Sequence, residues 1–373
     1  MTRPIVIAAG GTGGHTFPAQ ATAQALMARG HRVLLATDPR GAAFAAKVQG
    51  AELLPIRSAT FSGRNPIRIA AASIEILRGV MQARAAFRRE KPLAVVGFGG
   101  YPALPSMLAA RLTGTPSILH EANALLGRVN RLVAKRVTKI AVAFPRTHLL
   151  PANAAAKTIL VGNPVRPAIV EKATPYSPPG PEGPIHLLVF GGSQGARVMS
   201  DVVPAALALL PEGLRGRLRV VQQARGEDLE RARAAYAALG VAAETADFFT
   251  DIPERMAGAH LTICRSGASS CAELTAMGRP ALLVPYPFAT DDHQSYNARV
   301  LADSGAAKMI PQPAFTADAV ATATTFCAFW AAVWASTVTG SPASWVGAEE
   351  ASNSRVRRTI GSASSASKSW TLA

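Results

Sequence analysis

The residues of this chain that could do chemistry stand in short polar stretches directly after apolar runs. Residues 5–9 are Ile-Val-Ile-Ala-Ala, and residues 10–15 are Gly-Gly-Thr-Gly-Gly-His. Glycines at such a turn let the backbone approach a ligand closely, and the N–H groups of a following helix attract anionic or polar oxygens. The spacing matches neither the Walker A loop nor the G-x-G-x-x-G dinucleotide turn. The stretch predicts a phosphate- or sugar-binding turn, with a plain strand-to-helix turn as the alternative.

Two further glycine-rich turns follow apolar runs. Residues 191–197, Gly-Gly-Ser-Gln-Gly-Ala-Arg, come after the run 185–190, and residues 97–101, Gly-Phe-Gly-Gly-Tyr, come after the run 93–96. Ligands of open α/β folds bind beyond the carboxyl ends of the strands, where such turns lie. Glycine turns in both halves of the chain therefore predict a cleft between two sheets.

Residues 264–280 repeat the order of strand, glycine turn and helix, and they carry two charged candidates. Glu273 is expected on the first turns of the helix, where its carboxylate can accept hydrogen bonds from two ribose hydroxyls, and Arg265 can meet a phosphate. A buried ion pair or a helix cap is the alternative role of Glu273. Downstream, a polar cluster contains His293 and Gln294, which we expect to contact a sugar.

Two of the seven histidines, His15 and His120, directly follow apolar strands in the first half of the chain. An imidazole titrates near neutral pH and can take a proton from an attacking hydroxyl, although a packing role is the alternative for each. The sequence contains no D-x-D pair and no His or Asp cluster with metal-ligand spacing. We therefore expect backbone dipoles and arginines, rather than a metal, to neutralise a diphosphate.

The elements that must position these residues alternate between short apolar runs and longer helical segments, as in parallel sheets covered by helices. The first helix is predicted at residues 18–28. Strands are predicted at residues 5–9, 33–37, 93–96, 117–119, 140–142, 185–190, 218–221, 261–264 and 281–284. The chain is therefore expected to be an α/β protein with two doubly wound halves.

A Pro-rich stretch at residues 173–184 suits a connection between the halves, because proline cannot continue a helix or a central strand. The predicted plan is a first domain at residues 1–172, this linker, a second domain at residues 185–320 and an atypical tail at residues 321–373. The tail holds all four tryptophans and is rich in serine. We interpret it as irregular or disordered, or as the product of a shifted reading frame.

The net charge of +16 lies entirely in the first half of the chain: residues 1–160 carry 21 basic and 5 acidic side chains, and residues 161–373 carry 18 of each. This favours an anionic partner such as a membrane surface or a phosphate-bearing ligand, with an Arg-rich solvated surface as the alternative. No aromatic-interleaved basic platform points to nucleic acid. Three cysteines without framework spacing indicate a reducing compartment, and we expect neither a signal peptide nor a membrane span.

Six segments that carry candidate residues occur in a fixed order. They are residues 10–15, 97–101, 120–123 (His-Glu-Ala-Asn), 162–166 (Gly-Asn-Pro-Val-Arg), 191–197 and 264–294. Together they resemble the MurG family, the bacterial N-acetylglucosaminyltransferases of peptidoglycan synthesis. The resemblance covers about residues 5–310 and implies a GT-B glycosyltransferase fold, with two Rossmann-like domains and UDP-N-acetylglucosamine held mainly by the second.

The resemblance implies an inverting transfer of N-acetylglucosamine from the UDP-linked donor to the C4 hydroxyl of the lipid-linked N-acetylmuramyl-pentapeptide, converting lipid I to lipid II. His15 is the implied general base and Glu121 the second candidate. Ser193 and Arg166 are implied at the diphosphate and Glu273 at the uridine ribose. The full set of implied substrate-binding residues is Thr12, Gly13, Gly14, Asn123, Arg166, Ser193, Gln194, Thr250, Arg265, Ala268, Glu273, His293 and Gln294. No metal or other cofactor is implied.

The basic first half then has a partner in the anionic membrane that carries the lipid acceptor. The predicted membrane patch consists of Ile67, Ile74, Leu77, Arg84, Phe87, Arg88 and Arg89. An ordinary amphipathic core helix with an Arg-rich outer face is the alternative interpretation of this segment. The resemblance implies a peripheral protein on the cytoplasmic face of the inner membrane, with cell-wall synthesis proteins as further partners.

Two other enzyme classes compete with this interpretation. One is a GT-B transferase that acts on another membrane lipid, and the other is a nicotinamide-dependent oxidoreductase with Asp38 as the ribose-binding acid. Residues 120–123 and 162–166 favour the peptidoglycan acceptor. The chain also departs from the family pattern at Ala122 and at residues 222–225, and no counterpart of the family's last helices follows the second domain.

Overall fold

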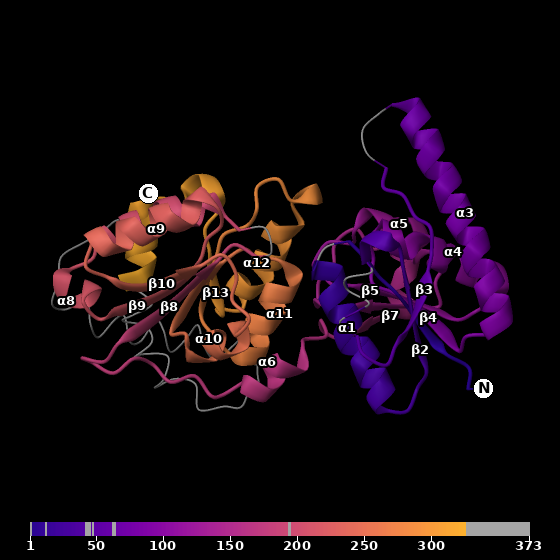
Figure 1. Ribbon diagram of the computed structural model, residues 1–373, viewed down its shortest axis with the longest axis horizontal. Coiled ribbons are helices and arrows are strands. Elements are labelled where there is room, and N and C mark those ends of the chain that lie inside the picture. The colour runs from indigo at the N-terminus through magenta and orange to yellow at the C-terminus, as the bar shows by residue number, and fades with distance from the viewer. Residues whose placement is uncertain are drawn as a thin grey trace.

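The computed structural model describes residues 2–11, 13–41, 46, 48–61, 65–192 and 195–325. Two parallel sheets, one from each half of the chain, lie side by side with helices packed around them (Figure 1). In spatial order the first sheet contains β3 (Glu52–Pro55), β2 (Val33–Thr37), β1 (Ile5–Ala8), β4 (Ala94–Gly97), β5 (Ser117–Glu121), β6 (Lys139–Val142) and β7 (Thr158–Leu160). The second contains β10 (Ala242–Ala246), β9 (Leu218–Gln223), β8 (Ile185–Phe190), β11 (Leu261–Cys264), β12 (Ala281–Leu283) and β13 (Ala307–Met309).

The strands are joined by helices, as parallel neighbours require. In the first half these are α1 (Gly13–Ala28), α3 (Pro66–Glu90), α4 (Leu104–Thr113), α5 (Arg128–Ala134) and α6 (Pro167–Lys172). The second half contains α7 (Arg197–Ala208), α8 (Glu212–Arg215), α9 (Glu227–Ala238), α10 (Ile252–Gly258), α11 (Ala268–Met277) and α12 (His293–Asp303). Short 3-10 turns are η1 (Pro39–Gly41), η2 (Tyr101–Ala103), η3 (Ala152–Lys157), η4 (Thr290–Asp292) and η5 (Gln312–Ala314).

The nine predicted strands are all present, which confirms the α/β architecture of two doubly wound sheets. The predicted start of the first helix is wrong, because α1 begins at Gly13 and encloses Pro18. Proline favours the first turn of a helix, which is why the pattern pointed to Pro18, but about one further turn precedes it. This extra turn brings His15 from the predicted loop into the helix.

Helix α3 packs one face against the core of the first sheet and leaves the other face open. Val80, Ala83 and Phe87 share the inner face because they are separated by three, four and seven residues. Phe87 is 2% exposed and belongs to this core, so its predicted place in a membrane patch is wrong. Arg84 is half-buried, whereas Arg88 and Arg89 at the end of α3 are exposed.

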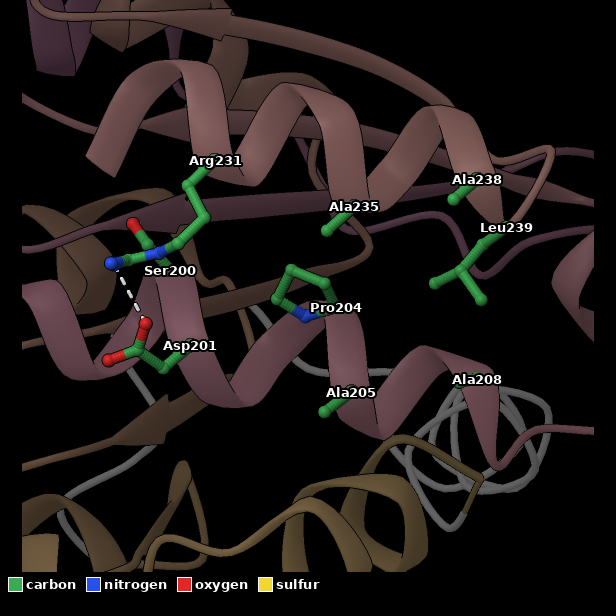
Figure 2. Close-up of a pocket in the computed structure, with 9 residues that line it drawn as sticks. All are labelled: Ser200, Asp201, Pro204, Ala205, Ala208, Arg231, Ala235, Ala238 and Leu239. Carbon is green, nitrogen blue, oxygen red and sulfur yellow. Dashed lines mark ion pairs between the residues drawn. The ribbon is translucent and has the colours of Figure 1, made fainter. Parts of the chain in front are cut away.

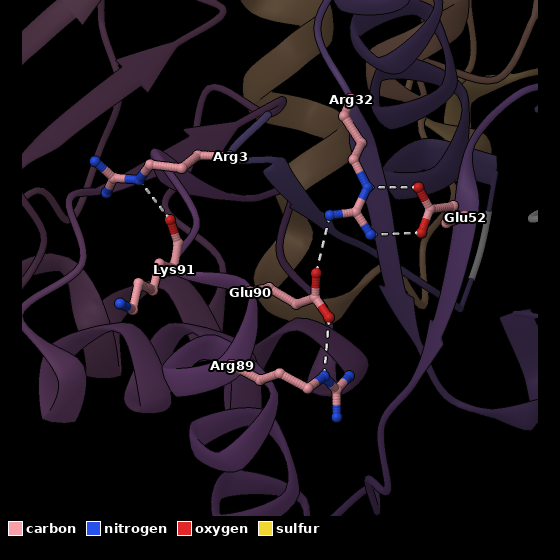
Figure 3. A network of polar contacts seen from close by, with 6 residues as sticks. All are labelled: Arg3, Arg32, Glu52, Arg89, Glu90 and Lys91. Atoms are coloured by element: carbon pink, nitrogen blue, oxygen red, sulfur yellow. Dashed lines mark hydrogen bonds and ion pairs between the residues drawn. The ribbon is translucent and has the colours of Figure 1, made fainter. Parts of the chain in front are cut away.

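A polar network ties the end of α3 to the sheet (Figure 3). The guanidinium of Arg32 donates two hydrogen bonds to Glu52, at 2.6 and 2.7 Å, and one to Glu90 at 2.9 Å. Arg89 donates to the same Glu90 carboxylate at 2.9 Å. These bonds lower the pKa of both carboxyl groups and join β2, the edge strand β3 and α3.

The Pro-rich stretch at residues 173–184 lies along the second domain. Arg279 donates to the backbone and hydroxyl oxygens of Thr174, at 3.1 and 2.9 Å, and Arg217 donates to the carbonyl oxygens of Gly180 and Gly183. Helix α6, which precedes this stretch, packs against α10 and α11 of the second domain. The path of the chain between the sheets therefore runs through the residues just before α6.

Residues 317–325 form a helix whose buried side chains, Val320 and Ala323 among them, pack into the second core. The first five residues of the predicted tail, 321–325, thus belong to the second domain. The rest of the predicted tail lies outside the described residues.

Candidate active site

His15 lies in the first turn of α1, against the glycine turn at residues 97–101. A Cβ atom built on Gly99 would lie 3.2 Å from His15 Cε1, and one built on Gly100 would lie 3.4 Å from His15 Cδ2. Both glycines have positive φ angles, 85° and 73°, which side chains rarely tolerate. The glycine turn is therefore packed directly onto the imidazole.

Burial lowers the pKa of His15, while the carboxylate of Glu121 and the backbone of Phe98 oppose this shift in part. Burial also lowers the pKa of His120, which is 3% exposed and whose Nε2 lies 3.2 Å from the carbonyl oxygen of Gly162. Both imidazoles are consequently neutral at pH 7. A neutral imidazole can accept a proton, so either ring is chemically able to act as a base.

Glu121, the second candidate base, is 1% exposed and accepts four hydrogen bonds. Its Oε1 accepts from the backbone and side-chain nitrogens of Asn123, at 2.9 and 3.0 Å. Its Oε2 accepts from the backbone N–H of Gly127 at 2.8 Å and from Asn130 Nδ2 at 2.7 Å. With both oxygens engaged in this way, the arrangement favours a role in holding the loop at residues 122–127 over a role as base.

Arg166 and Glu273 form an ion pair at the boundary of the two domains. Arg166 Nε and Nη2 each lie 2.9 Å from Glu273 Oε1, and the Arg166 guanidinium lies 5.2 Å from the centroid of the Phe17 ring on α1. Glu273 is 7% exposed; burial raises its pKa and Arg166 opposes that shift. A buried ion pair is the alternative role that the sequence analysis gives for Glu273, in place of a ribose contact.

Arg265 hydrogen-bonds the segment that follows β12. Its Nη1 donates to the carbonyl oxygens of Val284 and Pro285, at 3.2 and 3.1 Å, and its Nη2 donates to Gln312 Oε1 at 2.7 Å. The side chain is 7% exposed. A phosphate contact by Arg265 would require these bonds to be exchanged.

The start of α12 holds the two predicted sugar-binding residues. Gln294 Oε1 accepts from the backbone N–H of Tyr286 at 3.0 Å, and His293 Nδ1 lies 2.8 Å from the carbonyl oxygen of Thr290. Asn297, one turn further along α12, donates to Asn123 of the first domain at 3.0 Å, and α1 packs against the neighbouring helix α11. The structure therefore places the predicted sugar-binding residues of α12 near the boundary with the first domain.

The remaining predicted residues divide into three groups. Gly13 and Gly14 begin α1, and Ala268 begins α11 and is buried. Thr250 is exposed in the segment between β10 and α10. The predicted positions that lie outside the described residues are Thr12, Ser193 and Gln194.

The described residues on either side of two of those positions lie close to one another. A Cβ atom on Gly191 would lie 2.3 Å from the backbone nitrogen of Ala196, and Gly192 and Gly195 have φ angles of 80° and 74°. A side chain at position 191 would therefore clash with the backbone at Ala196, which accounts for the glycine there. Helix α7 begins directly afterwards, at Arg197.

Two buried amides near this site were absent from the predicted set. Asn130 donates to Glu121, and Asn297 hydrogen-bonds residues of both domains. Asn297 stands three residues after Gln294, on the same side of one helix, and this spacing was the available signal. Nothing in the sequence around Asn130 distinguishes it from a surface residue.

A separate groove lies between α7 and α9 (Figure 2). Four alanines line it together with Pro204, Leu239 and Ser200, and Arg231 pairs with Asp201 at 2.7 Å at one end. None of the predicted site residues lines this groove. Elsewhere in the part of the chain that is described, no three His, Cys, Asp or Glu side chains gather as a metal-ligand set.

Comparison with known proteins gives consistent matches over both domains. Residues 5–142 match the model of the glycosyltransferase family 28 N-terminal domain, and residues 186–328 match that of the family 28 C-terminal domain. A protein of Rhodospirillum centenum is 51% identical over 85% of this chain and 84% of its own length. A protein of Methylorubrum extorquens is 53% identical over 86% of this chain and 88% of its own length. Both are named UDP-N-acetylglucosamine--N-acetylmuramyl-(pentapeptide) pyrophosphoryl-undecaprenol N-acetylglucosamine transferase.

Solved structures agree with these matches. The crystal structure of Acinetobacter baumannii MurG superimposes with a TM-score of 0.71 at 29% identity and covers 97% of this chain and 100% of that one. The calicheamicin glycosyltransferase CalG4 superimposes with a TM-score of 0.60 at 18% identity, covering 88% of this chain and 90% of that one, which supports the fold alone.

Proposed function

The chain belongs to the MurG family of glycosyltransferase family 28 and transfers N-acetylglucosamine from UDP-N-acetylglucosamine to the lipid-linked N-acetylmuramyl-pentapeptide, and we propose that both substrates meet where α1 and Asn123 of the first domain lie against α11 and α12 of the second. The observations that carry this placement are the packing of α1 against α11 and the hydrogen bond from Asn297 on α12 to Asn123 of the first domain. Family membership gives no support to the oxidoreductase, the nucleic-acid binder or another acceptor lipid.

The reaction is an inverting single displacement. The C4 hydroxyl oxygen of the muramyl sugar attacks the anomeric carbon, and the bond from that carbon to the diphosphate oxygen breaks as UDP departs with the electron pair. The hydroxyl proton passes to His15, which must come within about 3 Å of that oxygen. The neutral imidazole produced by burial supports this role.

The donor is held by the second domain. Glu273 exchanges Arg166 for the ribose hydroxyls when the nucleotide binds, and Arg166 turns to the diphosphate with the backbone N–H groups of the turn after β8. The positive end of α7 supports the developing charge on the leaving UDP. Because these groups supply the positive charge, the reaction needs no metal ion.

Direct measurement of UDP binding tests the donor placement. Glu273→Ala removes the carboxylate from the ribose and leaves Arg166 unpaired, so UDP affinity should fall about tenfold or more by titration calorimetry. Glu254→Ala is the matched control, because it removes an exposed carboxylate of the same domain that pairs only with Lys172 at 3.2 Å among the described residues. Undiminished affinity in Glu273→Ala would refute the ribose contact.

The exposed face of α3 contacts the anionic membrane that carries the acceptor. The protein is therefore peripheral on the cytoplasmic face of the inner membrane. Other cell-wall synthesis proteins are its neighbours there. Support comes from Ile67, Ile74 and Leu77, which are 78%, 51% and 61% exposed, and from the exposed Arg88 and Arg89 on the same helix. Among the helices described, none is long and apolar enough to cross a bilayer.

A further inference from the structure

One buried side chain of α12, Asn297, hydrogen-bonds both domains next to the proposed active site. Its Oδ1 accepts from the backbone N–H of Ala124 at 2.8 Å. Its Nδ2 donates to Asn123 Oδ1 at 3.0 Å and to the carbonyl oxygen of Ser266 at 3.1 Å. Asn297 is 0% exposed, so losing any of these partners would leave a polar group buried without a hydrogen bond.

The side-chain amide of Asn123, which accepts the hydrogen bond from Asn297, is held in one orientation. Its backbone and side-chain nitrogens both donate to Glu121, and its side-chain oxygen accepts from Asn297. The orientation of this amide is thus set from two sides, by Glu121 within its own domain and by Asn297 from the other domain. A change in the position of α12 therefore acts directly on Asn123.

The segment that leads into α12 is joined to the first domain by a second contact. Asp291 accepts from Arg128 Nη2 at 2.7 Å and from Arg131 Nη2 at 2.5 Å, both on α5. Asp291 and Asp292 have φ angles of 53° and 54°, a conformation that costs free energy in residues other than glycine. The ion pairs hold the start of α12 against the first domain.

We propose that Asn297 is a positioning residue, which transmits occupancy of the donor-sugar site at the start of α12 to Asn123 and the part of the active site that the first domain supplies. Gln294 and Asn297 lie one helical turn apart, so a sugar that fixes Gln294 also fixes Asn297 and, through it, Asn123 and Ala124. The inference rests on the proposed donor-sugar contact at Gln294.

The test compares Asn297→Ala with Gln222→Ala. Gln222 is a matched control because its amide is also 0% exposed and bonds Ser200 and Tyr236, both inside the second domain. In Asn297→Ala, kcat should fall about tenfold or more while KM for UDP-N-acetylglucosamine changes less than about threefold, since misplacement of reacting groups lowers turnover rather than donor binding. Gln222→Ala should keep kcat near that of the unmodified protein.

Hydrogen exchange supplies the second readout. In the unmodified protein and in Gln222→Ala, UDP-N-acetylglucosamine should slow amide exchange in the peptide that contains Ala124, and in Asn297→Ala it should not. Asn297→Asp keeps the acceptor for Ala124 but removes both donors, so it should show the same loss of kcat even if the alanine variant folds poorly.

Variants of Gln294 and Asn297 distinguish failure of the donor-sugar contact from failure of the positioning role. If Gln294→Ala leaves UDP-N-acetylglucosamine affinity unchanged, the donor-sugar contact is wrong. If Gln294→Ala weakens the donor but both Asn297 variants keep normal kcat and donor-dependent protection at Ala124, the positioning role is refuted and the donor site stands.

Discussion

At neutral pH the imidazole of His15 is uncharged, because burial lowers its pKa from the usual 6.5. The neutral form of histidine accepts protons, whereas the protonated form cannot. With His15 as the base, the transferase should therefore be fully active at pH 7 and should lose activity as the pH falls through the lowered pKa of His15. This is the expected acid limb of the profile of kcat/KM against pH.

His15→Ala should lower kcat by about 10²- to 10⁴-fold, the usual contribution of a general base, while UDP affinity stays nearly unchanged. Steady-state transfer assays and calorimetry measure the two effects separately. His31→Ala is the control, since His31 is an exposed histidine just beyond the far end of α1. Unchanged turnover in His15→Ala would remove His15 as the base.

Glu273 shows what a sequence pattern can and cannot predict about a single residue. The spacing around residues 264–280 correctly placed Glu273 on a helix that begins at the domain boundary, but it left ribose contact and ion pair open. The partner, Arg166, lies 107 positions earlier in the chain. Periodicity describes the face on which a residue lies and carries no information about partners from another domain.

At the scale of elements, the strands that sequence reasoning missed are β3, β7, β10 and β13, and these are the four outer strands of the two sheets. Their side chains are largely exposed or half-buried. The prediction relied on continuous apolar runs, which mark strands buried on both faces, so the central strands were found and the edges were not.

The proposed membrane surface on helix α3 can be tested by substitution of its exposed apolar residues. The double variant Ile67→Gln, Leu77→Gln removes two large exposed apolar side chains, and binding to vesicles that contain anionic lipid should fall severalfold in a sedimentation assay because less apolar surface enters the interface. Leu209→Gln is the control, since Leu209 is 54% exposed but lies on the second domain. Vesicle binding that survives the double variant would refute this membrane surface.

For the whole molecule, the main consequence of the fold is that the proposed site draws residues from both domains. The proposed base and Asn123 come from the first domain, Glu273 and Gln294 come from the second, and Arg166 and Asn297 make contacts between the two. The alternation of apolar runs and helical segments correctly predicted two doubly wound halves. The geometry of their contact could not be predicted, because it depends on single polar side chains that meet only after both domains have folded.

Metal-independent transfer at this interdomain site can be tested in a single assay. The folded protein, checked by a cooperative melt, is given labelled UDP-N-acetylglucosamine and a short-chain lipid-linked muramyl-pentapeptide in the presence of EDTA. We expect labelled N-acetylglucosamine on the acceptor at a rate that added Mg²⁺ does not raise. Absence of transfer by a folded protein that still binds UDP, or transfer that only Mg²⁺ restores, would refute metal-independent transfer at this site.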